Sequence, residues 1–128
     1  MIDLLLDTNI VIYLINGDKK YVSFMRQFEE KQSGVSVITY METLIGAYEA
    51  PYEQEIQEFF GKTEIIPLNV AIAQKSAAWL QGSTHKSLRH PRLADVVIGQ
   101  TALALGVPLV TNNPKDFVSM NGLKVIAP

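Results

Sequence analysis

Short apolar runs alternate with longer helical stretches along almost the whole 128-residue chain. Such runs are typical of buried strands, because a parallel strand covered on both faces is apolar at every position. We expect strands at residues 2–6, 35–38, 64–66, 109–110 and 123–126. Strands that alternate with helices predict an α/β fold, here a mostly parallel sheet of four to five strands with helices on both faces. The length predicts a single domain over residues 1–128.

The helical stretches between these runs are delimited by turn-forming residues. Helices are expected at residues 8–15, 19–31, 39–48, 52–60, 70–80 and 92–105. Asn16-Gly17 and Ser33-Gly34 are predicted to end the first and second helices, and Gly106 is predicted to end the last. In open parallel sheets, ligands bind beyond the carboxyl ends of the strands, so the strand-to-helix junctions are the positions to inspect for function.

The chain contains no cysteine and only two histidines, His85 and His90. It therefore has no disulfide, no thiol nucleophile and no cysteine-ligated zinc or iron–sulfur cluster. A bound metal must be held mainly by oxygen ligands, which Mg²⁺ and Mn²⁺ prefer. No apolar run approaches the ~20 residues that span a bilayer. The first residues lack the basic segment of a signal peptide, so we expect a cytoplasmic protein without membrane association.

The net charge of −2 conceals an uneven distribution of charge. Residues 1–64 carry a charge of −6, whereas residues 65–128 carry +4. The most basic stretch is residues 84–92, which contains Lys86, Arg89 and Arg92. These three side chains are candidates for contacts with the phosphates of a polyanion. The alternative is an ordinary solvated surface loop.

Four acids stand at or near expected helix starts, and two of them follow apolar strands directly. Asp7 ends the first strand, and Glu42 lies one turn into the helix after the second. Asp95 lies near the start of the last long helix, and Asp116 follows the fourth strand. Each has a structural alternative, because acids favour helix N-termini. Asp7 is a candidate N-cap, and Thr39-x-x-Glu42 matches a capping box.

Taken together, the four acids favour a functional site over separate caps. Junctions of a parallel sheet can lie along one edge, and carboxylates brought together there repel one another unless cations neutralise them. Metal ions held by carboxylates support phosphodiester hydrolysis. Polar residues at the same junctions are suited to orient water or phosphate: Thr8, Asn9, Thr111, Asn112 and Asn113.

Four motifs in this order resemble the PIN-domain ribonucleases, and most closely the VapC toxins of toxin–antitoxin pairs. The resemblance spans residues 4–117. The motifs are Leu-Leu-Asp7-Thr-Asn9, Ile-Thr39-x-x-Glu42-x-x-x-Gly46, Asp95-x-x-Ile98 and Val-Thr111-Asn-Asn113-x-x-Asp116-Phe117.

The resemblance implies an α/β/α sandwich and a Mg²⁺- or Mn²⁺-dependent endoribonuclease that acts as a toxin. It makes Asp7 and Asp95 the main metal ligands, with Glu42 completing the site or orienting the attacking water and Asp116 as the fourth acid. Some relatives carry an acid at the position of Asn112 or Asn113, so either asparagine or Asp116 could complete a second metal site. The partners implied are an RNA substrate, a small antitoxin and a second copy of the chain.

Two other functions are compatible with parts of the pattern. A catalytically silent binding module that acts through a partner protein would be marked by loss of the acids, all of which are present. A small phosphohydrolase could use Asp7 as a nucleophile. The haloacid-dehalogenase-like pattern requires a second aspartate two residues later, where this chain has Asn9.

Overall fold

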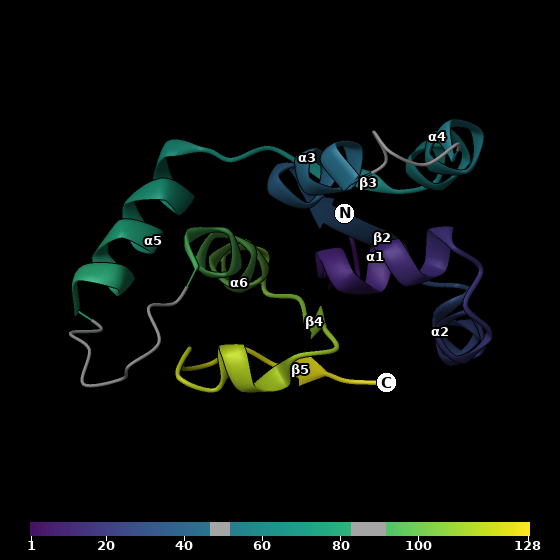
Figure 1. Cartoon of the computed structure of the whole chain (residues 1–128). Helices are drawn as coiled ribbons and strands as arrows, with labels where there is room; N and C mark the ends of the chain where they lie inside the picture. The colour runs from purple at the N-terminus through teal and green to yellow at the C-terminus, as the bar shows by residue number, and fades with distance from the viewer. Residues whose placement is uncertain (47–51, 83–91) are drawn as a thin grey trace.

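The computed structural model describes residues 1–46, 52–82 and 92–128 (Figure 1). Its strands are β1 (Leu4–Leu6), β2 (Ser33–Ser36), β3 (Glu64–Ile66), β4 (Leu109–Val110) and β5 (Val125–Ile126). Its α-helices are α1 (Thr8–Ile15), α2 (Lys19–Met25), α3 (Val37–Gly46), α4 (Glu53–Gly61), α5 (Val70–Gly82) and α6 (Leu93–Leu105). Two short 3₁₀ helices are η1 (Arg26–Phe28) and η3 (Pro114–Phe117).

The five strands form one sheet in the order β3-β2-β1-β4-β5, and every neighbouring pair is parallel. This confirms the predicted parallel sheet. Successive side chains of the central strand β1 point to opposite faces. Leu5 packs in the core on the side of α5 and α6, whereas Leu4 and Leu6 pack in the core with α1, α2 and α4. Figure 1 shows these two sets of helices on opposite sides of the sheet, which confirms the three-layer sandwich.

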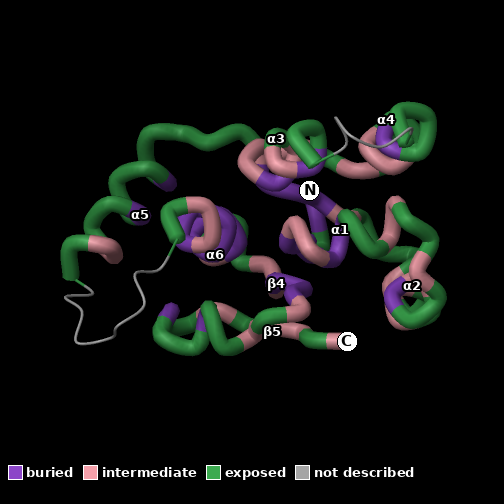
Figure 2. Tube along the Cα trace, viewed as in Figure 1, coloured by how far each residue is buried: buried purple, intermediate pink, exposed green. Residues whose placement is uncertain are grey.

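Helix α6 is the most deeply buried helix in the described part of the chain (Figure 2). Residues 96–102 are all buried, so this helix is in contact with neighbours around its whole circumference. Gly99 permits its close approach to the segment after β4, because a Cβ there would overlap the sulfur of Met120 and lie 3.3 Å from Cδ1 of Phe117. Among the described residues, no helix has the length and apolar character needed to cross a membrane.

The boundary between the second strand and the third helix differs from the prediction. Ser33 and Gly34 belong to β2 and do not interrupt the chain, while Val37 and Ile38 are already helical. The hydroxyl of Ser36 accepts the backbone N–H of Ile38 at 3.1 Å, which caps the helix earlier than expected. Gly34 suits a strand here because the Ile2 side chain would lie within 2.7 Å of any Cβ.

The second helix is also shorter than predicted. It ends at Met25 and continues only as the single turn η1, so residues 29–31 are not helical. The segment after β4 forms the 3₁₀ helix η3, and the Asn113 side chain makes no capping hydrogen bond there. Pro114 stands in its first turn, where a proline is tolerated because its missing N–H would have no partner there.

Candidate active site

Asp7 lies where β1 meets α1, with only 4% of its surface exposed. Its Oδ1 accepts the backbone N–H of Thr8 at 2.8 Å, so it is the N-cap of α1, as predicted. Its Oδ2 accepts the hydroxyl of Thr111 at 2.7 Å and the side-chain amide of Asn9 at 3.3 Å. Burial raises the pKa of this carboxyl, and the charge of Glu42 raises it further, against the opposing effect of these hydrogen bonds. Asp7 is therefore a rigidly held acid at the carboxyl end of the sheet.

Glu42 does not form the predicted capping box. Because α3 begins at Val37, Thr39 lies inside the helix, and the Glu42 side chain turns to α1 instead. The Thr8 hydroxyl donates to Oε1 of Glu42 at 2.6 Å and lies 3.0 Å from the hydroxyl of Thr39. Since the single proton of Thr8 goes to Glu42, the fully buried Thr39 donates to Thr8. Two hydroxyls in series thus hold Glu42 toward the end of β1.

Asp95 is half-buried in the first turn of α6. Burial is the largest cause that raises its pKa, to about 6, and the charges of Asp7, Asp116 and Glu42 raise it as well. The charge of Arg92 opposes the shift. Within the described residues, the Asp95 carboxyl has neither a hydrogen bond nor an ion pair, so it is available to a ligand.

Asp116 is exposed in η3 and is close enough to Asp95 to raise its pKa. The four predicted acids therefore share one electrostatic environment at the carboxyl end of the sheet.

The predicted supporting residues also gather around Asp7. The Asn9 side chain accepts the backbone N–H of Asn112 at 3.1 Å, and the Thr111 hydroxyl accepts that of Asn113 at 3.0 Å. Sequence reasoning did not identify Tyr21, whose hydroxyl lies near the Asn112 side chain. No local pattern could indicate this contact, because α2 and the segment after β4 are about 90 residues apart in the sequence.

One predicted basic residue reaches the acids. Nη2 of Arg92 lies 3.8 Å from Oε2 of Glu42, which is the only ion pair between described residues. Lys86 and Arg89 lie outside the described residues.

The donor chemistry of this cluster fits a hard divalent cation. The side chains offer carboxylate, amide and hydroxyl oxygens, and the half-buried Asp95 has no ion-pair partner among the described residues. Over residues 1–46, 52–82 and 92–128, no three acidic or histidine side chains already form a ready-made set of metal ligands. The acids are thus neighbours whose repulsion a cation would relieve.

Replacing Asp95 by asparagine should stabilise the metal-free protein at neutral pH. The pKa of Asp95 is higher in the folded chain, about 6, than its ordinary value of 3.8. As the pH rises from about 4 to 6, the unfolded chain therefore loses this proton first and wild-type stability falls. Above pH 6 the loss of stability caused by the ionised Asp95 no longer changes with pH. We expect Asp95→Asn to raise the free energy of unfolding by ~1–2 kcal/mol, a figure reduced because the carboxyl is half-exposed. This gain exceeds the roughly 0.3–1 kcal/mol that an acid contributes near a helix N-terminus.

The measurement is thermal unfolding in EDTA between pH 4 and 8, where Asp95→Asn should unfold ~3–10 °C higher than wild type at pH 7 and equally at pH 4. Glu30→Gln, at an exposed position outside the cluster, is the matched control and should follow wild type. A difference that does not change with pH would contradict the repulsion among these acids.

The chain is similar to known proteins over almost its whole length. Residues 4–123 match the PIN domain family. Ribonuclease VapC1 of Haemophilus influenzae (strain R2866) is 30% identical over 126 residues, which cover 94% of this chain and 93% of that protein. A chain of a toxin–antitoxin complex from Klebsiella pneumoniae has a TM-score of 0.80 and 31% identity, covering 97% of this chain and 96% of its own.

A further structure has the same fold at lower identity. It is VapBC2 from Rickettsia felis bound to a DNA fragment from the promoter, with a TM-score of 0.83, 22% identity and 98% coverage of both chains. The match of the family model over nearly the whole chain, together with the 30% identical relative, shows the family. The chain belongs to the PIN domain family, among the VapC-type ribonucleases.

Proposed function

We propose that this chain is a metal-dependent endoribonuclease that uses Asp7, Glu42, Asp95 and Asp116, and that it is the toxin of a toxin–antitoxin pair. The observation that carries the proposal is the charge coupling at Asp95, whose pKa is raised toward neutrality by burial and by the three other acids. Carboxylates held together in this way are suited to Mg²⁺ or Mn²⁺. The relatives named as ribonucleases support RNA as the substrate.

In this mechanism, Asp7 and Asp95 would hold the metal, and Glu42 would complete the ligand set or orient water. A bound divalent cation supplies an activated water and stabilises charge on the phosphate. Thr111 and Asn9 orient Asp7 by donating hydrogen bonds to Oδ2, and these bonds oppose the rise in its pKa caused by burial. Water adds to phosphorus and the bond to one ribose oxygen breaks, which leaves one phosphate monoester end and one hydroxyl end.

The direct test of this function is cleavage of labelled RNA by the purified chain. We expect internal cleavage in Mg²⁺ or Mn²⁺ and none in excess EDTA. Cleavage that continues in EDTA would exclude the carboxylate-held metal.

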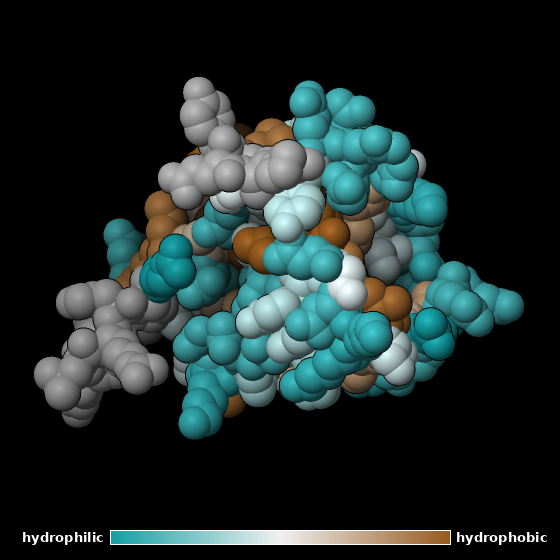
Figure 3. Space-filling model, turned by 45° about the vertical axis from the view of Figure 1, so that its right-hand side comes forward, coloured by the Kyte–Doolittle hydropathy of each residue, from teal (hydrophilic) through white to brown (hydrophobic). Residues whose placement is uncertain are grey.

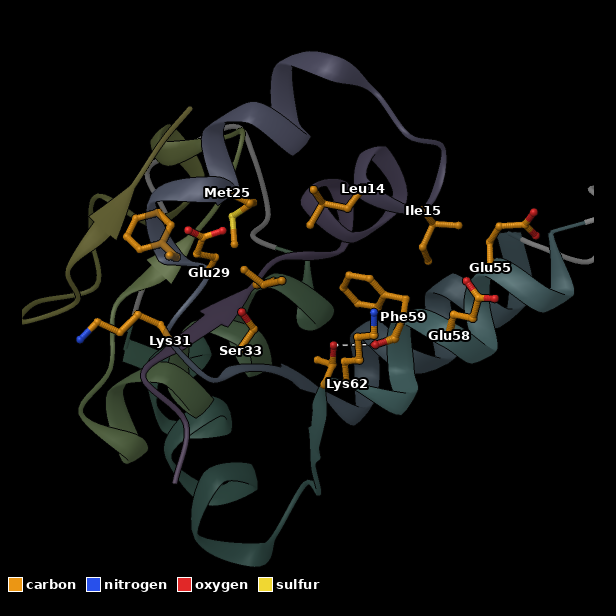
Figure 4. Close-up of a pocket in the computed structure, with 13 residues that line it drawn as sticks. Leu14, Ile15, Met25, Glu29, Lys31, Ser33, Glu55, Glu58, Phe59 and Lys62 are labelled. Atoms are coloured by element: carbon orange, nitrogen blue, oxygen red, sulfur yellow. Dashed lines mark hydrogen bonds between the residues drawn. The ribbon is translucent and has the colours of Figure 1, made fainter.

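The solved structural neighbours are toxin–antitoxin complexes, which supports an antitoxin partner. We propose that this partner binds a groove of about 470 Å³ between α1, η1 and α4 (Figure 4). Leu14 and Phe59 face one another across its apolar floor, and Glu55 and Glu58 of α4 lie at its rim. Three acids and two lysines line the groove, namely Glu29, Glu55, Glu58, Lys31 and Lys62. The two acids of α4 lie on one side of it, so an antitoxin segment with apolar side chains and a basic side chain toward Glu55 and Glu58 would be complementary.

A homodimer is a further part of the proposal. It is supported by exposed apolar residues on α3: Met41, Leu44 and Ile45. On the face shown in Figure 3, in contrast, hydrophilic side chains cover most of the surface and apolar areas between them are small.

Reversing the charge at the groove should weaken binding of the antitoxin. For Glu55→Lys combined with Glu58→Lys we expect at least ~10-fold weaker binding to the cognate antitoxin, mainly through slower association, because rim charges steer the encounter. RNA cleavage by the free chain should be unchanged, since both residues lie outside the acid cluster. Surface plasmon resonance measures the binding.

Glu64→Lys is the control, because this exposed acid on β3 does not line the groove. Equal affinity of the double variant and this control would place the antitoxin elsewhere.

A further inference from the structure

Arg92 contacts the acid cluster through a weak ion pair. It is the N-cap of α6, but its side chain makes no capping hydrogen bond, and 75% of that side chain is exposed. Its guanidinium lies 3.8 Å from Oε2 of Glu42, which is a long and solvated ion pair. Exposed pairs of this kind are weak, so a competing ligand can replace either partner.

Both oxygens of Glu42 are engaged within the chain. The Thr8 hydroxyl donates to Oε1 and Arg92 pairs with Oε2. The hydrogen bond from Thr8 to Oε1 holds the Glu42 side chain in position, whether Oε2 pairs with Arg92 or with another cation. A divalent cation at Oε2 therefore competes with the guanidinium, because two positive groups beside one oxygen repel each other.

Arg92 also lies close to Asp95. It precedes this acid by three residues, a spacing that places the two on the same face at the start of a helix, and its charge lowers the pKa of Asp95. A guanidinium in this place reduces the negative potential that attracts a cation to both Glu42 and Asp95. The same planar fork of donors fits a phosphate at least as well as a carboxylate.

We propose that Arg92 pairs with Glu42 in the free protein and pairs with an RNA phosphate when RNA binds. RNA and the divalent cation then bind cooperatively. This inference rests on the function proposed above. RNA that draws Arg92 away frees Oε2 of Glu42, and the cation in turn frees Arg92 for RNA. By thermodynamic linkage, each ligand increases the affinity of the other by the same factor.

The experiment is a Mn²⁺ titration, followed by electron paramagnetic resonance of the free ion, with and without RNA. The probe is a short, mixed-sequence phosphorothioate RNA, chosen because it resists hydrolysis. For wild type we expect this RNA to tighten Mn²⁺ binding by roughly 3–10-fold.

For Arg92→Gln we expect two changes. Without RNA, Mn²⁺ should bind ~3-fold more tightly than to wild type, because its competitor is gone. RNA should then tighten Mn²⁺ binding clearly less than it does for wild type, because only the direct attraction between the cation and the phosphate remains. Arg26→Gln removes the same charge from an exposed arginine in η1 that forms no ion pair with any acid of the described residues, and it should keep the wild-type coupling. If Arg92→Gln and Arg26→Gln behave alike, the proposal is wrong.

Asp95→Asn distinguishes an error in the role of Arg92 from an error in the proposed metal site. If Asp95→Asn leaves Mn²⁺ affinity unchanged, the site itself is misplaced and both proposals fail. If Asp95→Asn abolishes Mn²⁺ binding while Arg92→Gln retains the full coupling to RNA, the site stands and the role of Arg92 is refuted.

Discussion

Replacing Asp7 by asparagine should slow RNA cleavage by about 10³-fold or more, which corresponds to ~4 kcal/mol of lost transition-state stabilisation. Asparagine has nearly the same shape but no charge, so the site loses its most rigidly held anion. The fold should survive, because an amide oxygen can still accept the N–H of Thr8, and the Thr111 hydroxyl can reverse to accept a proton. The measurement is the initial rate on labelled RNA in Mn²⁺.

Asp95→Asn should give a loss of similar size, although it should stabilise the fold. Asp3→Asn is the matched control, because Asp3 is exposed at the opposite end of β1 and its carboxylate accepts the backbone N–H of Gln32, away from the acid cluster. It should cleave RNA at the wild-type rate. A folded Asp7→Asn protein within about fivefold of wild type would remove Asp7 from the mechanism.

Replacing Phe117 by alanine should reduce the free energy of unfolding by ~3–5 kcal/mol. Its ring is 1% exposed and lies among the core residues on the α6 side of the sheet. It packs against α6 at Gly99, which has no side chain to fill the volume that the ring would leave. Because small domains have a net stability of ~5–15 kcal/mol, this one cavity removes a large fraction of it.

The loss would be measured by urea unfolding followed by circular dichroism. Val118→Ala is the control, since Val118 is the next residue and is 78% exposed, and it should change stability by less than ~0.5 kcal/mol. Cleavage should also weaken for Phe117→Ala, because this ring connects η3, which carries Asp116, to α6, which carries Asp95. A loss below ~1 kcal/mol would show that the core can close around the cavity.

Local sequence patterns were sufficient to predict the layers of this protein. The helix at residues 8–15 and the strand at residues 64–66 match the structure at both ends, because an N-cap or a turn lies beside each. Apolar runs with helices between them allowed only a parallel sheet covered on two faces, and that sheet brings Asp7 and the segment of Asp116 to one edge. The cap role of Asp7 was likewise local, since its partner is the next residue.

The predicted start of α3 was wrong, because two neighbouring residues could each cap this helix. Thr39 and Glu42 have the spacing of a capping box, yet Ser36 caps the helix first. Sequence alone could not rank these two caps, because their energies are similar and the choice depends on how β2 pairs with β1 and β3.

The sequence by itself determined the layered fold and the order of the four acids, since both follow from periodicity and from residue types at junctions. Only the tertiary structure decided what each acid contacts. Thr111 reaches Asp7 across 104 residues and Thr8 reaches Glu42 across 34, and no local preference encodes such distances. The pairing of Arg92 with Glu42 has the same origin, because it exists only where the start of α6 packs beside α3.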